Sequence, residues 1–339
     1  MTTIIDAYTH NVPITYLRQI VDTPDPSSQE AAKSTLSRCN VQPNLIDYET
    51  RISQMDKYRI DRQVSCIYQG VDPNHLSVGS GKEQIKLCKG INDAMAEQME
   101  KSKQRIVSLG TPPLKALQDG GMEEIRRAIK DLGLKGFMVV TNVGGTPVDR
   151  FTAFWEEVNR LGVPVYLHPV DPISSVSRPY EDEYDLMHVL GWPFETSLTM
   201  ARLVLSGTMS KYANLKVVAH HLGAMIPFFA GRINESYDKE MSLVKPEQKF
   251  DEVKGKGRAM DHFRQFYLDT AIGGNVAAIK CAREIFGAEK IIFGTDYPFG
   301  PRNGIPRLES YPGLIGKMDI SDDEKRLIFE ENASRLLGI

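Results

Sequence analysis

Short apolar runs alternate with helical patterns along the chain, and this alternation restricts the fold more than any other feature. The runs are rich in β-branched and aromatic residues and occupy residues 2–6, 63–68, 105–110, 135–140, 163–168, 215–220, 265–270 and 290–295. Between them, apolar residues recur at spacings of three and four, as in residues 122–132 and 151–161. Nearly continuous apolar strands are typical of a parallel sheet covered on both faces. The pattern predicts an α/β protein with one domain, a (β/α)8 barrel of the TIM type over residues 1–339.

Three stretches are too long to be simple connections, namely residues 11–45, 169–195 and 240–262. The first two follow strands and are therefore expected as long loops on the C-terminal face of the barrel, where active sites lie. The third is interpreted as a solvated surface segment.

Four of the expected strands end on histidine or aspartate side chains. His10 closes the first segment, His168 the fifth, the pair His220 and His221 the sixth, and Asp296 the last. These positions take four of the seven histidines, which a chance distribution would not give. Because the carboxyl ends of all barrel strands meet on one face, we expect these side chains to lie together in an active site.

Imidazoles and a carboxylate from different strands are suited to a divalent metal ion. His10, His168 and Asp296 are the expected ligands, and three protein ligands with an open position are typical of a catalytic ion. Such an ion lowers the pKa of a bound water toward about 7, or polarises a carbonyl or carboxylate group. A single histidine at a strand end is more often structural, so the hypothesis depends on several residues converging.

Composition limits the classes of function. The chain has 41% hydrophobic and 25% charged residues, as in an ordinary globular protein, and its net charge of −3 gives no basic surface for nucleic acid. The four cysteines are scattered without a Cys-x-x-Cys pair, which argues against a disulfide framework and indicates a reducing compartment. No apolar run approaches the roughly 20 residues of a membrane span, and no basic leader precedes the first strand. We expect a cytoplasmic protein that binds neither nucleic acid nor membrane.

An ordered series of motifs resembles the amidohydrolase superfamily, and within it amidohydrolase family 2. That family contains aminocarboxymuconate-semialdehyde, γ-resorcylate and 5-carboxyvanillate decarboxylases. The resemblance runs nearly end to end and includes Asp6-Ala-Tyr-Thr-His10, residues 51–58, Asn92-Asp93, residues 133–136, His168-Pro169, residues 203–207, residues 221–228, Gly231-Arg232 and residues 293–299. Each motif alone is weak, but their order and spacing together are specific.

The resemblance implies roles for the residues at the strand ends. His10, His168 and Asp296 resemble the family's metal ligands, and His221 resembles the catalytic histidine that activates water or relays a proton. His221 and Asp296 would share the proton transfers. The fourth strand does not end on a lysine, so the resemblance implies one divalent metal ion, with Zn²⁺ favoured and Mn²⁺ as the alternative.

The sequence departs from the family at Tyr8, where the family has a histidine or a glutamate. A phenol has an ordinary pKa of about 10 and must lose its proton before it binds a metal ion. Two outcomes are open at this point. Either three residues hold the metal ion in a more open site, or Tyr8 points its hydroxyl at the substrate in a site without metal.

Two arginines and a tryptophan are further candidate substrate contacts. Arg51 and Arg232 resemble the family's pair that grips the substrate carboxylate, a contact suited to the planar guanidinium. The second arginine comes from the neighbouring subunit in the family, which implies a homodimer. Trp192 is expected to line the pocket together with Tyr8, although a core residue would give the same pattern.

Three other polar residues are weaker candidates. Asp269 is expected either to orient a ligand histidine as a hydrogen-bond acceptor or to cap a turn. We expect His220 to be a buried structural residue with a backbone partner. His188 is kept as a faint candidate because it lies in the long segment after the fifth strand.

Three functions fit these residues. The leading hypothesis is an enzyme, a metal-dependent non-oxidative decarboxylase (carboxy-lyase) of a small aromatic or muconate-like carboxylic acid. The second is a metal-dependent hydrolase of a lactone, amide or ring carbonyl that uses the same site. The third, suggested only by Tyr8, is a metal-free binding protein that keeps the fold. Release of carbon dioxide would distinguish the decarboxylase from the hydrolase. Absence of bound metal and of turnover would favour the binding protein.

Overall fold

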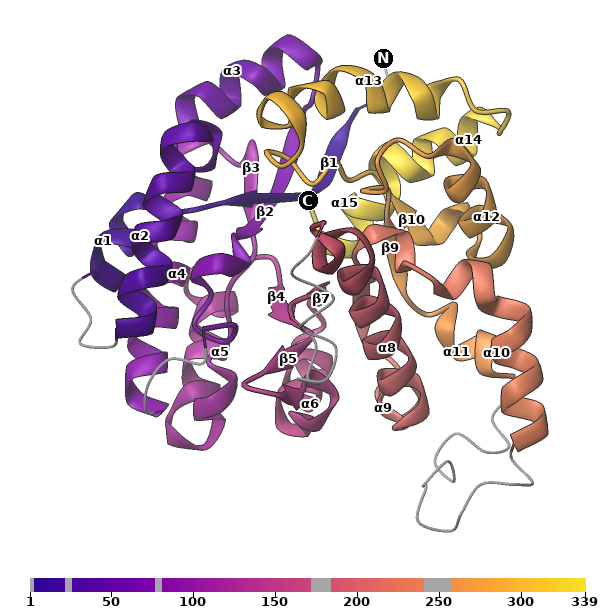
Figure 1. The fold of residues 1–339 in the computed structure, drawn as a ribbon, viewed down its shortest axis with the longest axis horizontal. Helices are drawn as coiled ribbons and strands as arrows, with labels where there is room; N and C mark the ends of the chain where they lie inside the picture. Colours follow the sequence, from indigo (N-terminus) through magenta and orange to yellow (C-terminus); the bar gives the residue numbers. More distant parts are fainter. Residues whose placement is uncertain (1–2, 22–25, 77–80, 172–183, 241–257) are drawn as a thin grey trace.

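A ring of parallel strands surrounded by helices forms the described part of the chain (Figure 1). The computed structural model describes residues 3–21, 26–76, 81–171, 184–240 and 258–339. Within these ranges the strands of the ring are β1 (Ile5–Asn11), β2 (Arg62–Ile67), β3 (Ile106–Ser108), β4 (Phe137–Val140), β7 (Pro164–His168), β8 (Lys216–Ala219), β9 (Tyr267–Asp269) and β10 (Ile291–Ile292).

Hydrogen bonding closes these strands into a barrel. β1, β2 and β3 form one parallel sheet, and β4, β7, β8, β9 and β10 form a second. Two parallel bridges join the sheets, because Gly110 after β3 pairs with Phe137 of β4, and Thr9 of β1 pairs with Tyr297 beyond β10. The barrel predicted from the apolar runs is confirmed.

Each predicted run overlaps a strand, but the bounds predicted for the first strand are wrong. The pattern predicts residues 2–6, whereas β1 begins at Ile5 and continues through His10 to Asn11. All seven residues of β1 are buried, and its polar residues find partners inside the barrel. The hydroxyl of Thr9, for example, donates to the carbonyl of Val64 on β2 at 2.9 Å. A prediction based on apolar continuity therefore stops too early.

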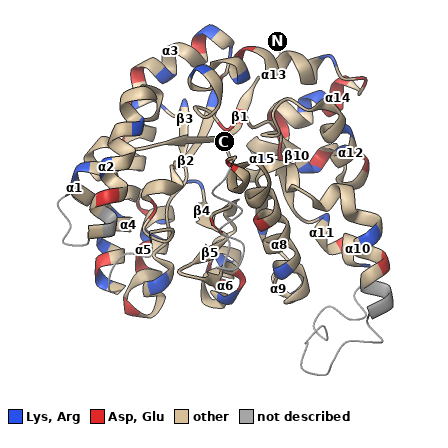
Figure 2. Cartoon of the chain, viewed as in Figure 1, with Lys and Arg blue, Asp and Glu red and all other residues tan. Residues whose placement is uncertain are grey.

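Helices cover the outside of the barrel, and charged residues of both signs are spread over them (Figure 2). Helices α5 and α6 confirm the helical patterns seen at residues 122–132 and 151–161. In chain order the helices are α1 (Ile14–Val21), α2 (Pro26–Val41), α3 (Tyr48–Tyr58), α4 (Gly81–Lys101), α5 (Gly121–Lys130), α6 (Thr152–Leu161), α8 (Trp192–Leu205), α9 (Thr208–Lys211), α10 (Ile226–Glu240), α11 (Ala259–Phe263), α12 (Val276–Phe286), α13 (Ile305–Gly316), α14 (Asp322–Arg326) and α15 (Asn332–Leu337).

The three long segments differ in how much of them the structure describes. In residues 11–45, of which 22–25 lie outside the described residues, the structure has α1, α2 and a short 3-10 helix, η1 (Pro43–Leu45). Much of the other two segments lies outside the described residues, namely 172–183 and 241–257. A small hairpin of β5 (Asn142–Val143) and β6 (Thr146–Pro147) follows β4. Among the described residues, no helix has the length and apolar character needed to cross a membrane.

Candidate metal centre at the strand ends

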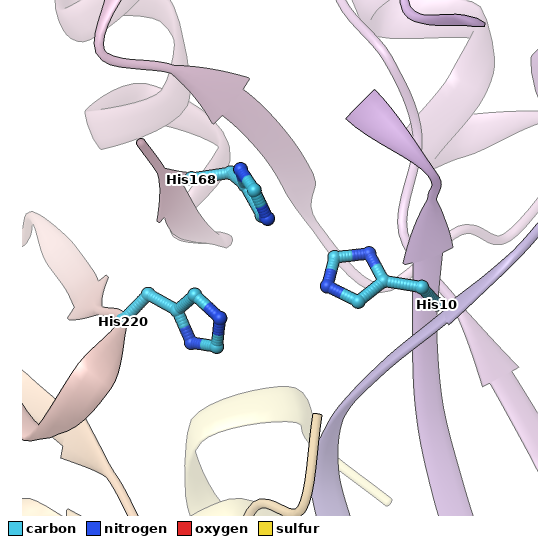
Figure 3. Close-up of side chains that lie close together, drawn as sticks. All are labelled: His10, His168 and His220. Atoms are coloured by element: carbon cyan, nitrogen blue, oxygen red, sulfur yellow. The ribbon is translucent and has the colours of Figure 1, made fainter. Parts of the chain in front are cut away.

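Three histidine side chains converge at the carboxyl ends of the strands (Figure 3). His10 comes from β1, His168 is the last residue of β7, and His220 directly follows β8. All three are buried, and one ring nitrogen of each lies within 4.8 Å of the others. The ring centroids of His10 and His168 are 5.1 Å apart, and those of His168 and His220 are 5.4 Å apart. The structure thus brings together two predicted ligands and one histidine that was expected to be structural.

Asp296, the third predicted ligand, lies beside these histidines. Its Oδ1 is 3.3 Å from Nε2 of His10 and 3.7 Å from Nε2 of His220. Its Oδ2 accepts a hydrogen bond from Nη1 of Arg307 at 2.7 Å. Burial acts against ionisation, but the neighbouring imidazoles of His10 and His220 and the charge of Arg307 hold the pKa of Asp296 well below its ordinary value. The carboxylate is therefore ionised and faces nitrogens that could bind a cation.

Each of the three imidazoles is oriented through its Nδ1 atom. His168 donates from Nδ1 to the carbonyl of the next residue at 2.7 Å, and His220 donates to a carboxylate oxygen of Asp269 at 2.6 Å. Nδ1 of His10 lies 3.4 Å from a carbonyl oxygen of β2. A proton fixed at Nδ1 leaves the Nε2 lone pair for a metal ion. Nε2 of His10 is buried without a hydrogen bond of good geometry to the described residues, and a metal ion bound there would satisfy it.

The surroundings of His168, His220 and His221 shift their pKa values in different directions. Burial and neighbouring imidazoles lower the pKa of His168 well below its ordinary value, and the pKa of His221 is lowered in the same way. Burial also acts to lower the pKa of His220, but the carboxylates of Asp269 and Asp296 outweigh it and raise that pKa to about 9. His168 and His221 are therefore neutral at neutral pH, whereas a cation bound at Nε2 of His220 must displace a proton.

Tyr8 keeps its hydroxyl bonded to the backbone. The buried hydroxyl donates to the carbonyl of Leu167 at 2.9 Å. Burial and nearby acidic groups raise the pKa of Tyr8 well above its ordinary value. The phenol ring stacks on the imidazole of His220, with centroids 3.9 Å apart and planes inclined by 9°. The expectation that Tyr8 points its hydroxyl at a substrate is therefore not met, because its one proton is given to the backbone.

The turn after β8 carries His221 and is held by Asp269. The rings of His220 and His221 lie 3.8 Å apart, and Nδ1 of His221 is buried without a hydrogen bond among the described residues. Besides holding His220, Asp269 accepts hydrogen bonds from the backbone nitrogens of Leu222 at 3.4 Å and Ala271 at 2.8 Å. Asp269 thus makes both contacts that the sequence left open. The prediction of a backbone partner for His220 is wrong, because its partner is a carboxylate.

Arg307 is a site residue that no sequence motif indicated. It extends from α13 and donates to the Thr295 carbonyl at 3.0 Å as well as to Asp296. A side chain at Gly300, where φ is +100°, would come within 2.8 Å of Nε of Arg307. Glycine therefore allows the guanidinium to reach the strand end. Arg307 lies eleven positions after Asp296, and a 3-10 turn, η8 (Pro301–Gly304), lies between them. The two residues therefore do not share one helix or strand whose periodicity would predict their contact.

The profile of the amidohydrolase family matches residues 5–339. The chain belongs to the amidohydrolase family. A 2-amino-3-carboxymuconate-6-semialdehyde decarboxylase of Dictyostelium discoideum is 27% identical to it, over 88% of this chain and 79% of that protein. A γ-resorcylate decarboxylase of Rhizobium sp. (strain MTP-10005) is 29% identical, over 88% of this chain and 90% of that protein. The family resemblance inferred from the motifs is confirmed.

Solved structures share the fold of this amidohydrolase. A 2,6-dihydroxybenzoate decarboxylase in complex with 2,6-dihydroxybenzoate has a TM-score of 0.78 and 25% identity, and the match covers 100% of both chains. Other solved decarboxylases of this fold, 20% and 24% identical to this chain, carry bound manganese.

Trp192 of this amidohydrolase lies against the histidine cluster at the start of α8. Its ring stands edge-on to His168, with centroids 5.7 Å apart, and its Nε1 is buried without a hydrogen bond among the described residues. The ring centroid of His188 lies 4.9 Å from that of Trp192, and His188 is exposed and pairs with Asp185 at 3.1 Å. Trp192 therefore occupies a position where a pocket wall would lie.

The two arginines expected to grip a substrate carboxylate do not join the cluster within one chain. Arg51 of α3 is 1% exposed, and it donates to the backbone carbonyl of His10. It also donates to side-chain oxygens of Thr9 and Gln63 at 3.1 Å each. Arg51 thus donates its hydrogen bonds to residues of the barrel strands. This arrangement does not fit the expected contact of Arg51 with a substrate carboxylate. Arg232 is exposed on α10.

Proposed function

We propose that this amidohydrolase is a metal-dependent, non-oxidative decarboxylase of a small aromatic carboxylic acid. The observation that carries the proposal is the convergence of His10, His168 and Asp296, with His221 alongside, on the barrel face where such enzymes have their active sites. Relatives named as decarboxylases of γ-resorcylate and of an aminocarboxymuconate semialdehyde support a carboxylate substrate. The 2,6-dihydroxybenzoate complex supports an aromatic acid whose hydroxyl groups flank the carboxylate.

The residues at the strand ends fit a divalent metal ion. We assign His10, His168 and Asp296 as ligands, because neutral imidazole and ionised carboxylate are suited to such an ion. We favour one Zn²⁺, since an imidazole-rich site suits zinc, with Mn²⁺ as the alternative. When held by these residues, such an ion would supply a Lewis acid for a substrate carboxylate.

We propose that side chains of this protein deliver the proton that takes the place of carbon dioxide on the substrate. Loss of carbon dioxide leaves the electron pair of the broken bond on a ring carbon, and one proton must reach that same carbon. His221 is neutral, and its Nδ1 has no hydrogen-bond partner among the described residues, so we assign it a relay that takes a proton from solvent and passes it to the ring carbon. Asp296, kept ionised beside Arg307, would accept the proton of a substrate hydroxyl. Trp192 would exclude water from one side of the pocket.

Hydrolysis of a lactone, amide or ring carbonyl is the second candidate, because the same ligands and His221 serve it. A substrate labelled with ¹³C at its carboxylate separates the two functions. With γ-resorcylate and related hydroxybenzoates, we expect labelled carbon dioxide, loss of turnover after treatment with a chelator, and recovery with Zn²⁺ or Mn²⁺. A hydrolytic product that keeps the label would favour the hydrolase. A protein that neither binds metal nor turns over any acid would favour the metal-free binding protein.

We further propose that the enzyme is a cytoplasmic homodimer. Arg232 is exposed on α10, and on the same helix Phe228 and Phe229 are 79% and 41% exposed. Exposed apolar side chains beside a charged residue are suited to a protein interface. In such a dimer Arg232 would contact the substrate carboxylate in the partner's site. The four free cysteines are consistent with a reducing compartment.

A further inference from the structure

The residue that departs from the family pattern, Tyr8, lies against a histidine to which the motifs assigned no metal role. We infer that His220 is a direct metal ligand in this chain and replaces the ligand that is missing at position 8. The inference rests on the proposed metal-dependent function and adds one residue to the same site.

Position 8 offers no metal ligand in this structure. The Tyr8 side chain is 1% exposed, and its hydroxyl donates to the Leu167 carbonyl at 2.9 Å. Ligation would require the phenol to break this bond and lose its proton in a buried place. The ring is also packed on Tyr166, with centroids 5.4 Å apart, which resists reorientation. The site therefore needs a donor from elsewhere in the chain.

His220 has the geometry of that donor. Its Nδ1 is fixed by the Asp269 carboxylate at 2.6 Å, so its Nε2 is the atom left for a cation. Figure 3 shows its ring directed toward those of His10 and His168. One ring nitrogen of each of the three lies within 4.8 Å of the others. Zinc binds imidazole nitrogens at about 2.0–2.1 Å, so nitrogens sharing one ion lie roughly 3–4 Å apart. Small shifts of the rings would close this cluster on an ion.

The substitution at position 8 also orients the proposed ligand. The Tyr8 ring stacks on His220 with centroids 3.9 Å apart and planes inclined by 9°, which fixes the plane of the imidazole. A glutamate at position 8 would give no such surface. Tyr8 thus has two effects. It removes the metal ligand that the family has at position 8, and its ring orients His220, the ligand proposed to replace it. Asp296, whose Oδ1 lies 3.7 Å from Nε2 of His220, remains next to the same ion.

Metal affinity tests the inference without depending on turnover. We would titrate Zn²⁺ into the metal-free protein against a competing chelator, and record the visible absorption spectrum of the Co²⁺ form. Loss of an outer hydrogen-bond partner of a ligand already costs 10–100-fold in affinity, so we expect His220→Ala to weaken Zn²⁺ binding at least about 100-fold. His221→Ala is the matched control, because it removes the adjacent histidine of the same turn. We expect it to stay within about threefold of the native affinity and to keep the native Co²⁺ spectrum.

Two variants at position 8 extend the test, and Tyr8→Phe keeps it decisive even if His220→Ala fails to fold. Tyr8→Phe keeps the stacked ring and removes the oxygen, so we expect native metal affinity. The double variant Tyr8→His/His220→Ala restores the family's ligand, and we expect it to regain binding. A loss of affinity in Tyr8→Phe as large as that expected for His220→Ala would make the tyrosine oxygen the ligand and overturn the inference. Native affinity in His220→Ala would also overturn it while leaving the proposed function intact. Native protein that binds no metal ion would overturn both.

Discussion

At the scale of single residues, the carboxylate of Asp296 contacts both the histidine cluster and Arg307. One carboxylate oxygen faces two imidazoles and the other accepts from Arg307. Asp296→Asn keeps the shape of the side chain but removes the charge, so we expect more than about 100-fold loss of carbon dioxide release with an unchanged melting temperature. The exposed Asp261→Asn is the control and should keep full activity. Activity of Asp296→Asn within about tenfold of native would contradict the assigned role.

Asp6 is a buried carboxylate of β1 whose protonation should make stability depend on pH. Burial raises the pKa of Asp6 from 3.8 to about 7, although hydrogen bonds from Thr295 and Gln63 oppose the rise. Between pH about 4 and about 7 the folded chain holds a proton that the unfolded chain has released. The contribution of Asp6 to stability is therefore complete below pH about 4 and is lost as the pH rises through about 7.

The variant Asp6→Asn isolates this contribution because its amide does not titrate. We expect urea unfolding of the native protein to show a steeper fall in stability between pH about 4 and about 7 than unfolding of the variant. Parallel pH profiles for the two proteins would show that Asp6 has an ordinary pKa in the folded chain.

The sequence predicted some side chains of the site better than others, and the reason is physical. His10, His168 and Asp296 could be found because each closes an apolar segment of the sequence at or near the carboxyl end of a strand. The hydrogen-bond partner of Tyr8 could not, because it depends on which backbone carbonyl of the neighbouring barrel wall comes within reach. The hydrogen-bond partner of His220 was predicted wrongly for a related reason, since its orientation is set by Asp269 on another strand.

At the scale of elements, α3 and β1 are joined through Arg51. The N-cap residue Asp47 accepts from the backbone nitrogen of Thr50 at 2.9 Å and so fixes where α3 begins. Arg51, one turn later, then reaches into the barrel to the carbonyl of His10. We expect Arg51→Met to lower the free energy of unfolding by about 1–3 kcal/mol, because it leaves buried oxygens unpaired.

Urea unfolding with Arg335→Met as the matched control tests this role of Arg51. The Arg335 side chain is 60% exposed, so its loss should change stability by less than about 0.5 kcal/mol. An Arg51→Met protein of native stability with a greatly raised KM would instead support a grip on the substrate carboxylate.

Elements were predictable where their apolar pattern was continuous. The buried strands produced such runs, and α5 and α6 showed apolar spacings of three and four. Helix α2, Pro26–Val41, was missed because its sequence, PSSQEAAKSTLSRCNV, is mostly polar and carries no clear apolar stripe. The end of β1 was missed because polar residues 9–11 are satisfied only by neighbouring strands, a tertiary effect that local pattern does not contain.

At the scale of the whole molecule, the order of the strands could be predicted but the assembly could not. Alternating strands and helices leave few alternatives to a closed parallel barrel. The role proposed for Arg232, which is exposed on α10, would instead require a second chain, and a sequence pattern does not say which surface such a chain would cover. The role of Arg232 therefore has to be tested in the assembled dimer.

Mixed dimers provide that test. If Arg232 enters the partner's active site, Arg232→Ala and Asp296→Asn proteins should each be nearly inactive, but dimers formed from one chain of each should recover activity. One of the two sites in such a dimer combines an intact Asp296 with an intact Arg232 from the other chain, because a two-fold interface presents the same patch from both subunits. A desolvated contact between arginine and carboxylate is worth a few kcal/mol, about 100-fold or more in rate, so recovery toward half of native activity would be clear. Subunit exchange demonstrated by mass spectrometry without any recovery would place Arg232 outside the partner's site.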